Sequence, residues 1–345
     1  MSLRVGIIGT GAIATLHAKA YKSIGYTITA CTDVRADFGQ RFAEEHGAEF
    51  VASAEAVCRH PHVDYVDLCT LPGYRLDPVR WCAESGKAIQ VQKPIATTME
   101  IAREMVALAR RAGIVLGVVS QHRFDASSQF LIRAIRDGRL GRPIQCDAYI
   151  KWYRSAEYYS RPIKGSWAGE GGGALMNQAI HQVDLLRWFV GPVSSVFGMW
   201  QLGALHKIES EDVVTAVLSY ANGATGTIQA ATALWPGYPE RVELHGTKGT
   251  AIITGDRLTA WDVQDDAGDA PPLSTNVASG ASDPMAISLE PFERQFLDFG
   301  HAVKSGGRPL VSGDDGLEAL ALVDAVYRSC RSGVAVTPVS GEESS

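Results

Sequence analysis

The sequence has no long hydrophobic run and no excess of positive charge. None of its apolar stretches reaches the roughly 18 residues that a membrane-crossing helix needs. It holds 32 lysines and arginines against 38 aspartates and glutamates, a formal net charge of −6. That balance offers no general attraction to nucleic acid or to an anionic membrane, so we expect neither as a partner.

Cysteine is also sparse. The six cysteines are widely spaced, lie mostly in apolar segments, and form neither a C-x-x-C pair nor metal-ligand spacing. This pattern favours free thiols in a reducing compartment and predicts no metal site. The first residues, "MSLRVGIIGTG", enter an apolar strand without the hydrophobic region of a signal peptide. We therefore expect a cytoplasmic protein.

The patterning changes near residue 120. Before it, short β-like runs alternate with helical patterns, which predicts a parallel α/β sheet. After it, long alternating strands dominate from about 144 to 255, which predicts an α+β domain on an antiparallel or mixed sheet. The stretch 264–289, rich in small and polar residues, is expected to be a surface loop. Helices are expected at about 126–138, 174–190, 291–305 and 315–332.

A glycine motif follows the first predicted strand. In "GIIGTGAIA", Gly9, Gly11 and Ala14 form G-x-G-x-x-A, and Asp33 ends the second strand. In a dinucleotide site the first glycine permits a tight turn and the second lets the backbone approach a pyrophosphate at the helix N-terminus. Another α/β protein can use the same pattern as a simple tight turn. The acidic residue at this distance favours the dinucleotide site.

Asp33 bears on the choice of cofactor. A carboxylate here accepts hydrogen bonds from the ribose hydroxyls of NAD and repels an added 2′-phosphate. Arg35 lies close enough to accommodate that phosphate, although a solvated position in the first turn of a helix also explains it. We therefore predict NAD, with NADP possible.

"IQVQKPIATT" (residues 89–98) ends an apolar strand with a cation. In a parallel sheet, ligands bind beyond the carboxyl ends of the strands, where Lys93 and Thr70 both lie. A lysine there can polarise a carbonyl or stabilise an alkoxide. A surface lysine at the start of a loop is the competing interpretation.

A second polar group lies on the predicted helix 174–190. At about 100° per residue, Asn177, His181, Asp184 and Trp188 share one stripe of an otherwise apolar helix. Three interpretations are open: a buried row of hydrogen-bonded side chains, the solvent-exposed face of the helix, or part of a functional site. Histidine is the side chain best suited to moving a proton near neutral pH.

Together these stretches resemble the Gfo/Idh/MocA family over nearly the whole chain. "VGIIGTGAIA" resembles its dinucleotide fingerprint, "VQKP" its E-K-P motif, and "GGGALMNQAIHQVDLLRW" its G-G-G-x-L-x-D-x-x-x-H-x-x-D helix. "ESEDVVTAVLSYANGATGT", "GTKGT" and "GDDGLEALALVDAVYRS" match later family patterns. The ordered set is far more specific than any single motif.

The resemblance implies an α/β Rossmann domain followed by an α+β domain with a large open, mainly antiparallel sheet. We place the NAD(P)-binding domain at 1–122 and the substrate-binding and oligomerisation domain at 123–345. The implied activity is NAD(P)-dependent interconversion of a secondary hydroxyl and a ketone on a sugar, polyol or anionic sugar derivative. A homodimer or homotetramer formed through the second sheet is also implied.

By position, Lys93 matches the family's catalytic lysine and His181 the histidine that accepts the hydroxyl proton; Asn177 joins them as a catalytic candidate. The implied cofactor site consists of Gly9, Thr10, Gly11, Ala12, Ile13, Asp33, Thr70, Leu71, Pro72, Tyr74, Gln92, Lys93 and Gln121. The expected substrate contacts are Arg123, Lys151, Tyr153, Arg154, Tyr158, Trp167, Asn177 and His181.

The chain departs from the family pattern in three places. Gln92 replaces the usual glutamate before the lysine, and Asn177 replaces an aspartate. Leu71 and Arg75 stand where a T-P-x-x-x-H stretch usually has proline and histidine. Losing two carboxylates is expected to make the site less negative.

The segment 151–167 is rich in basic and aromatic residues, and in the family this region borders the substrate pocket. Such groups suit a sugar that carries a carboxylate or phosphate, or a nucleotide-sugar. Alternating strand faces followed by a solvated loop explain the pattern equally well.

Two further functions stay open. A dihydrodiol-type dehydrogenase would take a less polar ring substrate, against which the basic segment argues. A non-catalytic NAD-binding regulator would share the scaffold, but the chain retains both Lys93 and His181.

Overall fold

The computed structural model describes residues 2–161, 163–265, 268, 270–274, 279, 281 and 288–341. The chain divides into two compact units. The first unit contains residues 1–121 and 289–317, and the second contains 122–288 and 318–345. The expected loop at 264–289 falls largely outside the described residues.

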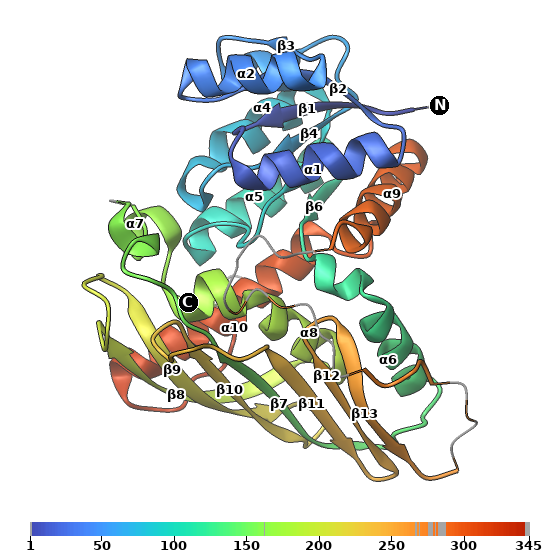
Figure 1. Cartoon of the computed structure of the whole chain (residues 1–345), viewed down its shortest axis with the longest axis vertical. Helices are drawn as coiled ribbons and strands as arrows, with labels where there is room; N and C mark the ends of the chain where they lie inside the picture. The colour runs from blue at the N-terminus through green and yellow to red at the C-terminus, as the bar shows by residue number, and fades with distance from the viewer. Residues whose placement is uncertain are drawn as a thin grey trace. The chain divides into compact units, whose positions relative to one another are not determined.

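The first unit is built on a six-stranded sheet in the order β3-β2-β1-β4-β5-β6 (Figure 1). Every strand pair in it is parallel, as the alternating pattern predicted. Its strands are β1 (Arg4–Ile8), β2 (Thr27–Thr32), β3 (Glu49–Phe50), β4 (Tyr65–Leu68), β5 (Ala88–Val91) and β6 (Leu116–Val118). This is the strand order of a Rossmann fold.

Helices join these strands. They are α1 (Ala12–Ser23), α2 (Ala36–His46), α3 (Ala54–Arg59), η1 (Pro72–Tyr74), α4 (Leu76–Ser85) and α5 (Met99–Ala112). The short β3 and α3 were not predicted, because two and six residues carry too little periodicity to stand out.

Helix α9 (Glu290–Ser305) also belongs to the first unit. The prediction placed all of 123–345, and so this helix, in the second domain. Phe296 stacks on Tyr21 of α1, with ring centroids 4.3 Å apart. Gln295 accepts a hydrogen bond from the Ser120 N–H and donates one to the Val118 carbonyl. These contacts join residues far apart in the sequence, which local patterning cannot foresee.

The second unit is built on a seven-stranded sheet in the order β13-β12-β11-β7-β10-β9-β8. Only the β7–β10 pair is parallel, so the prediction of a mainly antiparallel sheet is confirmed. The strands are β7 (Pro143–Lys151), β8 (Val193–Leu202), β9 (Glu211–Tyr220), β10 (Thr225–Ala231), β11 (Arg241–Gly246), β12 (Gly249–Thr254) and β13 (Arg257–Val263).

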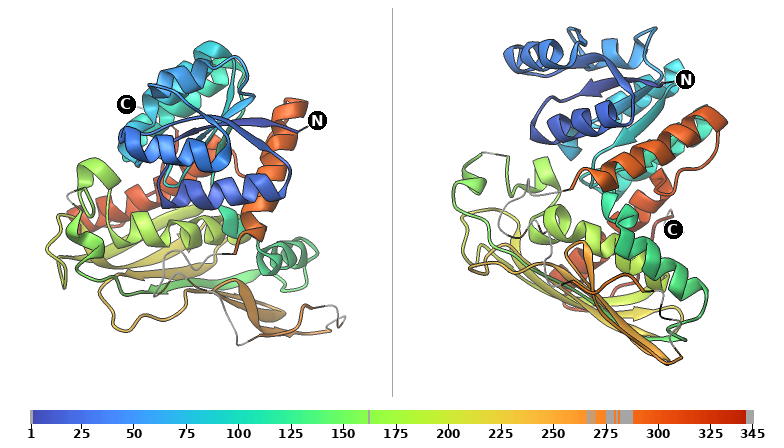
Figure 2. Two further views of the ribbon diagram at one scale, coloured as in Figure 1. Left: turned by 45° about the horizontal axis from the view of Figure 1, so that its top comes forward. Right: turned by 45° about the vertical axis from the view of Figure 1, so that its right-hand side comes forward.

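The helices of this unit lie along one face of its sheet, as Figure 2 shows. They are α6 (Ala126–Arg136), η3 (Tyr158–Ser160), α7 (Trp167–Glu170), η4 (Ala174–Ala179), α8 (Ile180–Val190) and most of α10 (Gly313–Ser332); η2 (Gln121–Phe124) begins the unit. The other face exposes apolar side chains, among them Phe197, Met199 and Val217.

The predicted helix 174–190 begins with a π-helical segment, η4, before the α-helical turns of α8. A step of about 100° per residue therefore does not apply across the whole stretch.

All six cysteines are free thiols. Among the described residues, no helix combines the length and apolar character that a membrane crossing requires.

Candidate functional site

Five polar or glycine-bearing segments meet at one edge of the six-stranded sheet. Each follows the carboxyl end of a strand: Gly9 after β1, Asp33 after β2, Thr70 after β4, Lys93 after β5 and Gln121 after β6. Because these strands are all parallel, their carboxyl ends share one edge, which is where such sheets bind ligands.

The glycine turn has the geometry that a dinucleotide needs. Gly9 has a φ of +87°, and a Cβ there would lie 3.2 Å from the backbone of Cys69 and Thr70. At Gly11, by contrast, no described atom lies within 4 Å of the position that a Cβ would occupy. Gly9 therefore makes the turn, and the space at Gly11 suits a ligand at the N-terminus of α1.

Asp33 is tied to this turn. Its Oδ2 accepts hydrogen bonds from the backbone N–H and hydroxyl of Thr10 at 2.8 and 3.0 Å, and its Oδ1 accepts one from the Arg35 N–H at 2.9 Å. Burial alone would raise the pKa of Asp33, but these hydrogen bonds and the Arg35 charge lower it below its ordinary value. The carboxylate is thus ionised and retains lone pairs for a ribose.

The loop after β4 contributes a second feature suited to a ligand. Within the described part of the chain, the Thr70 hydroxyl is buried without a hydrogen-bond partner. Nearby, Leu71 is half-buried, Pro72 is buried and Tyr74 is exposed. A buried hydroxyl in this position fits a polar ligand group that completes its hydrogen bonds.

Lys93 follows β5 and is half-buried. Its peptide bond to Pro94 is cis, and its N–H donates to the Gln92 side-chain oxygen at 3.2 Å. The structure thus puts the predicted lysine on the ligand-binding edge, with its backbone anchored.

In the second unit, His181 lies in the first turn of α8 and is buried. Its ring packs edge-on against His122, with centroids 5.0 Å apart, and His122 Nδ1 lies 2.8 Å from Asp125 Oδ2. Asn177, in η4, donates from its amide nitrogen to the Gly172 carbonyl at 2.8 Å. Sequence reasoning missed His122, although it stands in "SQHRF" between two residues that were singled out.

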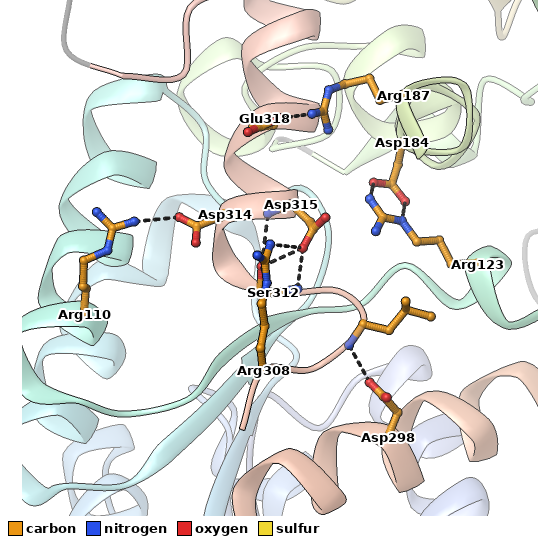
Figure 3. A network of polar contacts seen from close by, with 11 residues as sticks. Arg110, Arg123, Asp184, Arg187, Asp298, Arg308, Ser312, Asp314, Asp315 and Glu318 are labelled. Carbon is orange, nitrogen blue, oxygen red and sulfur yellow. Dashed lines mark hydrogen bonds and ion pairs between the residues drawn. The ribbon is translucent and has the colours of Figure 1, made fainter. Parts of the chain in front are cut away.

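Asp184 and Trp188 of the predicted stripe serve a different purpose. Arg123 forms a bidentate ion pair with Asp184 at 2.7 and 2.5 Å, and both side chains are buried (Figure 3). The guanidinium also lies 5.4 Å from the centre of the Trp188 ring. The ion pair with Asp184 gives Arg123 a structural role within its own unit, and that Arg123 also lines a substrate site stays a prediction.

The comparisons with known proteins fit this geometry. Residues 3–120 match the GFO_IDH_MocA family, described as "Oxidoreductase family, NAD-binding Rossmann fold", and residues 128–252 match the GFO/IDH/MocA C-terminal domain. The WlbA dehydrogenase of Bordetella pertussis, solved with NADH and UDP-GlcNAcA, is 30% identical over 98% of this chain and 99% of its own, with a TM-score of 0.87.

The chain belongs to the Gfo/Idh/MocA family. Two other relatives align over almost their full lengths. Myo-inositol 2-dehydrogenase of Thermotoga maritima is 28% identical over 95% of this chain and 96% of its own. The 1,5-anhydro-D-fructose reductase of Ensifer adhaerens is 29% identical over 98% of this chain and 99% of its own. This Gfo/Idh/MocA protein is an oxidoreductase whose Rossmann domain binds NAD.

In this Gfo/Idh/MocA protein, part of the basic segment is used to build the second unit. Arg154 is buried and donates to the Ala281 carbonyl at 2.9 Å and to the Gln178 side chain at 3.0 Å. Gln178 in turn donates to the Tyr158 hydroxyl at 2.9 Å. This arrangement supports the helix that carries Asn177, and that Arg154 also contacts substrate stays a prediction.

The remaining predicted substrate contacts of this segment are Lys151, Tyr153 and Trp167. Trp167 donates from its ring to the Glu209 carbonyl at 3.1 Å and packs against Tyr327. Lys151 is exposed, and Tyr153 packs edge-on against Trp235, which is 77% exposed. Lys151 follows the buried Ile150, and its ammonium lies 5.3 Å from the centre of the Tyr149 ring, so it faces the outer side of the sheet. That Lys151 and Tyr153 contact substrate stays a prediction.

Glu211, which sequence reasoning did not single out, caps the helix that bears Asn177. Its carboxyl group is fully buried and accepts from the N–H groups of Gly173 and Leu175 at 2.9 and 2.8 Å and from the Tyr327 hydroxyl at 2.8 Å. Burial raises the pKa of Glu211 to about 7, although these hydrogen bonds oppose the shift.

This raised pKa makes stability depend on pH. Between the ordinary value of 4.5 and about 7, the folded protein holds a proton on Glu211 that the unfolded chain releases. The free energy of unfolding therefore falls as pH rises through this window. Relative to that of Glu211→Gln, the free energy of unfolding of the wild type is expected to fall by at most about 3 kcal/mol between pH 4.5 and 7. Urea denaturation across this range measures the difference, and exposed Glu157→Gln is the control; a difference that does not vary with pH contradicts the prediction.

Asp33 provides a test of cofactor choice. Asp33→Ala removes a charged acceptor from the ribose position, so the dissociation constant for NAD is expected to rise about 10- to 100-fold. Discrimination against NADP is expected to fall at the same time. Calorimetry with both cofactors measures this, and Asp37→Ala on the exposed face of α2 is the control. Tighter binding of NADP than NAD by the wild type contradicts our interpretation of Asp33.

Proposed function

We propose that this protein is an NAD-dependent dehydrogenase that interconverts a secondary hydroxyl and a ketone on a sugar, polyol or anionic sugar derivative. One observation carries the proposal. The glycine turn, Asp33 and Lys93 share the carboxyl edge of a single parallel sheet, so a bound dinucleotide and a polarising cation would serve the same reaction centre.

The residues at this edge fit NAD. The open position at Gly11 and the first N–H groups of α1 suit the pyrophosphate, and the ionised Asp33 suits the ribose hydroxyls. NAD, when bound, supplies the acceptor for the hydride that leaves the substrate carbon.

The chain supplies the proton chemistry. Lys93 hydrogen-bonds the reacting oxygen and stabilises negative charge on it as the hydroxyl loses its proton. His181 takes that proton, directly or through Lys93. Asn177 stands one turn before His181 and helps to orient the reacting groups by hydrogen bonding.

An anionic sugar derivative is the substrate class that we favour. The segment 151–167 carries both basic and aromatic residues, a composition that suits a sugar bearing a negative group. The related WlbA dehydrogenase, solved with UDP-GlcNAcA, supports the same choice.

We also propose that copies of this chain associate through the outer face of the seven-stranded sheet. That face exposes Phe197 at 39%, Met199 at 68% and Val217 at 51%. A group of neighbouring exposed apolar side chains is typical of a surface that binds another protein chain. Light scattering in solution tests the expected dimer or tetramer.

A substrate screen tests the proposed activity. NAD is mixed with inositols, aldoses, uronic acids and nucleotide-sugars, and the absorbance of reduced nicotinamide is followed. We expect reduction with at least one compound that has a secondary hydroxyl. If every compound stays inert while NAD binds tightly, a non-catalytic regulator explains the chain better. If only dihydrodiols react, the dihydrodiol-type dehydrogenase replaces our proposal.

A further inference from the structure

The backbone around Lys93 is held by two side chains at which this sequence departs from the family pattern. One is Arg75, in the turn before α4, and the other is Gln92, directly before the lysine. Both are buried, and both contact backbone groups within one residue of Lys93.

Arg75 donates to backbone carbonyls on both sides of the lysine. Its Nη1 donates to the carbonyl of Gln92 and to that of Pro94. Its Nε and Nη2 donate to the Thr70 carbonyl at 3.2 and 2.5 Å. The planar guanidinium thus ties the loop after β4 to the loop after β5, which a single-point donor cannot do.

Burial lowers the pKa of Arg75 to about 9, while the nearby Cys69 and Asp67 raise it. The group is therefore still a cation at neutral pH. A buried cation that faces carbonyl oxygens keeps those oxygens satisfied and fixes their directions.

Gln92 anchors the lysine from the other side. A backbone N–H can only donate, so the Gln92 oxygen must face the Lys93 N–H, at 3.2 Å, and its amide nitrogen must face His17. The amide nitrogen lies 2.8 Å from His17 Nε2, which therefore acts as the acceptor. His17 Nδ1 then carries the proton and donates to Asp67 Oδ2 at 2.7 Å.

The far end of this chain of hydrogen bonds is packed inside the first unit. Asp67 also accepts from the Tyr21 hydroxyl at 2.9 Å. The His17 ring is fully buried and packs against Phe296 of α9, with centroids 4.8 Å apart, and against Phe292 at 5.2 Å. The orientation of Gln92 is thus set by packed groups in α1, β4 and α9.

We propose that Arg75 and Gln92 are positioning residues for Lys93, fixing the backbone on both sides of it so that its ammonium group is presented in one direction. The inference rests on the proposed function, because it takes Lys93 to act on the substrate oxygen. A lysine has four rotatable side-chain bonds, so a fixed backbone narrows the volume that its ammonium explores.

Arg75→Leu and Arg75→Lys test the first half. Leucine removes the donors, and lysine keeps the charge but loses the fork. We expect kcat to fall about 10- to 100-fold in Arg75→Leu and less in Arg75→Lys, because small misplacements of a reacting group have effects of this size. The dissociation constant for NAD is expected to rise in Arg75→Leu as well, because the same guanidinium holds the Thr70 carbonyl in the predicted cofactor loop, so kcat is compared at saturating NAD.

Gln92→Leu and Gln92→Glu test the second half and serve if the arginine variants fold poorly. Leucine cannot accept from the Lys93 N–H, whereas glutamate can. We expect kcat to fall in Gln92→Leu and to be partly restored in Gln92→Glu, because glutamate keeps the acceptor for the Lys93 N–H but lacks the donor to His17. Arg80→Leu, on the exposed side of α4, is the control and is expected to leave kcat unchanged.

Hydrogen exchange gives a readout that does not depend on turnover. The Lys93 amide is expected to exchange faster in Arg75→Leu and Gln92→Leu than in the wild type, with the rest of β5 unchanged. Unaltered exchange together with unaltered kcat overturns the inference. Faster exchange with wild-type kcat overturns it too, because the loop would then be held for stability alone.

If Lys93→Ala is fully active, or if no substrate reacts, the proposed function fails. The exchange result still reports whether the two side chains hold the loop.

Discussion

Lys93→Ala is expected to lower kcat/KM by about 10²- to 10⁴-fold, the usual range for losing a positioned acid or base. The alanine variant loses the cation that would bond the reacting oxygen. The glycine turn and Asp33 stay in place, so NAD affinity is expected to change little. Steady-state kinetics with the best substrate of the screen, together with NAD titration, measure both quantities.

The matched control is Lys22→Ala, which removes an exposed lysine from the last turn of α1. It is expected to behave as the wild type does. Near-normal kcat/KM in Lys93→Ala would assign the reaction to other groups and remove the lysine from the mechanism. A loss of activity that follows a loss of NAD binding would instead make Lys93 a cofactor contact.

The second large effect concerns the Arg123–Asp184 ion pair. Asp184→Ala leaves the buried Arg123 guanidinium without the carboxylate that accepts its two hydrogen bonds. Breaking one partner of a buried pair costs about 3–5 kcal/mol, so we expect a loss of that size in the free energy of unfolding. Urea denaturation followed by fluorescence measures it, provided that the two units are resolved or unfold together.

A double variant separates charge from packing. Arg123→Met with Asp184→Leu removes both charges and keeps apolar volume, so much of the lost stability is expected to return. If Asp184→Ala costs less than about 1 kcal/mol, the pair behaves like an exposed one. If the double variant is no more stable than the single, the loss reflects packing around Trp188 rather than an unpaired charge.

The parallel sheet and the glycine turn could be predicted because their signals are local. Gly9 is needed for its backbone conformation, and Asp33 follows its strand directly, so a short window of sequence carries both. The mainly antiparallel second sheet was also visible, since strands such as β9 alternate between buried and more exposed residues, here from Val214 to Tyr220.

What could not be predicted depends on contacts between distant segments. Arg123 and Asp184 are 61 positions apart, and Gln92 and His17 are 75 apart. A basic residue near a predicted site gives no local sign of whether it meets a ligand or a buried carboxylate. The sequence alone did not explain why a glutamine precedes Lys93. In the structure, its side chain accepts from the Lys93 N–H and donates to His17.

The central claim is that this chain transfers hydride between a secondary alcohol carbon and NAD. The most direct measurement uses sugars, polyols and uronic acids that carry deuterium on the carbinol carbon, with mass spectrometry of the cofactor after reaction. We predict that deuterium appears in the reduced nicotinamide with the wild type and is almost absent with Lys93→Ala. A wild-type protein that binds NAD tightly but leaves the cofactor unlabelled with every compound would contradict the claim.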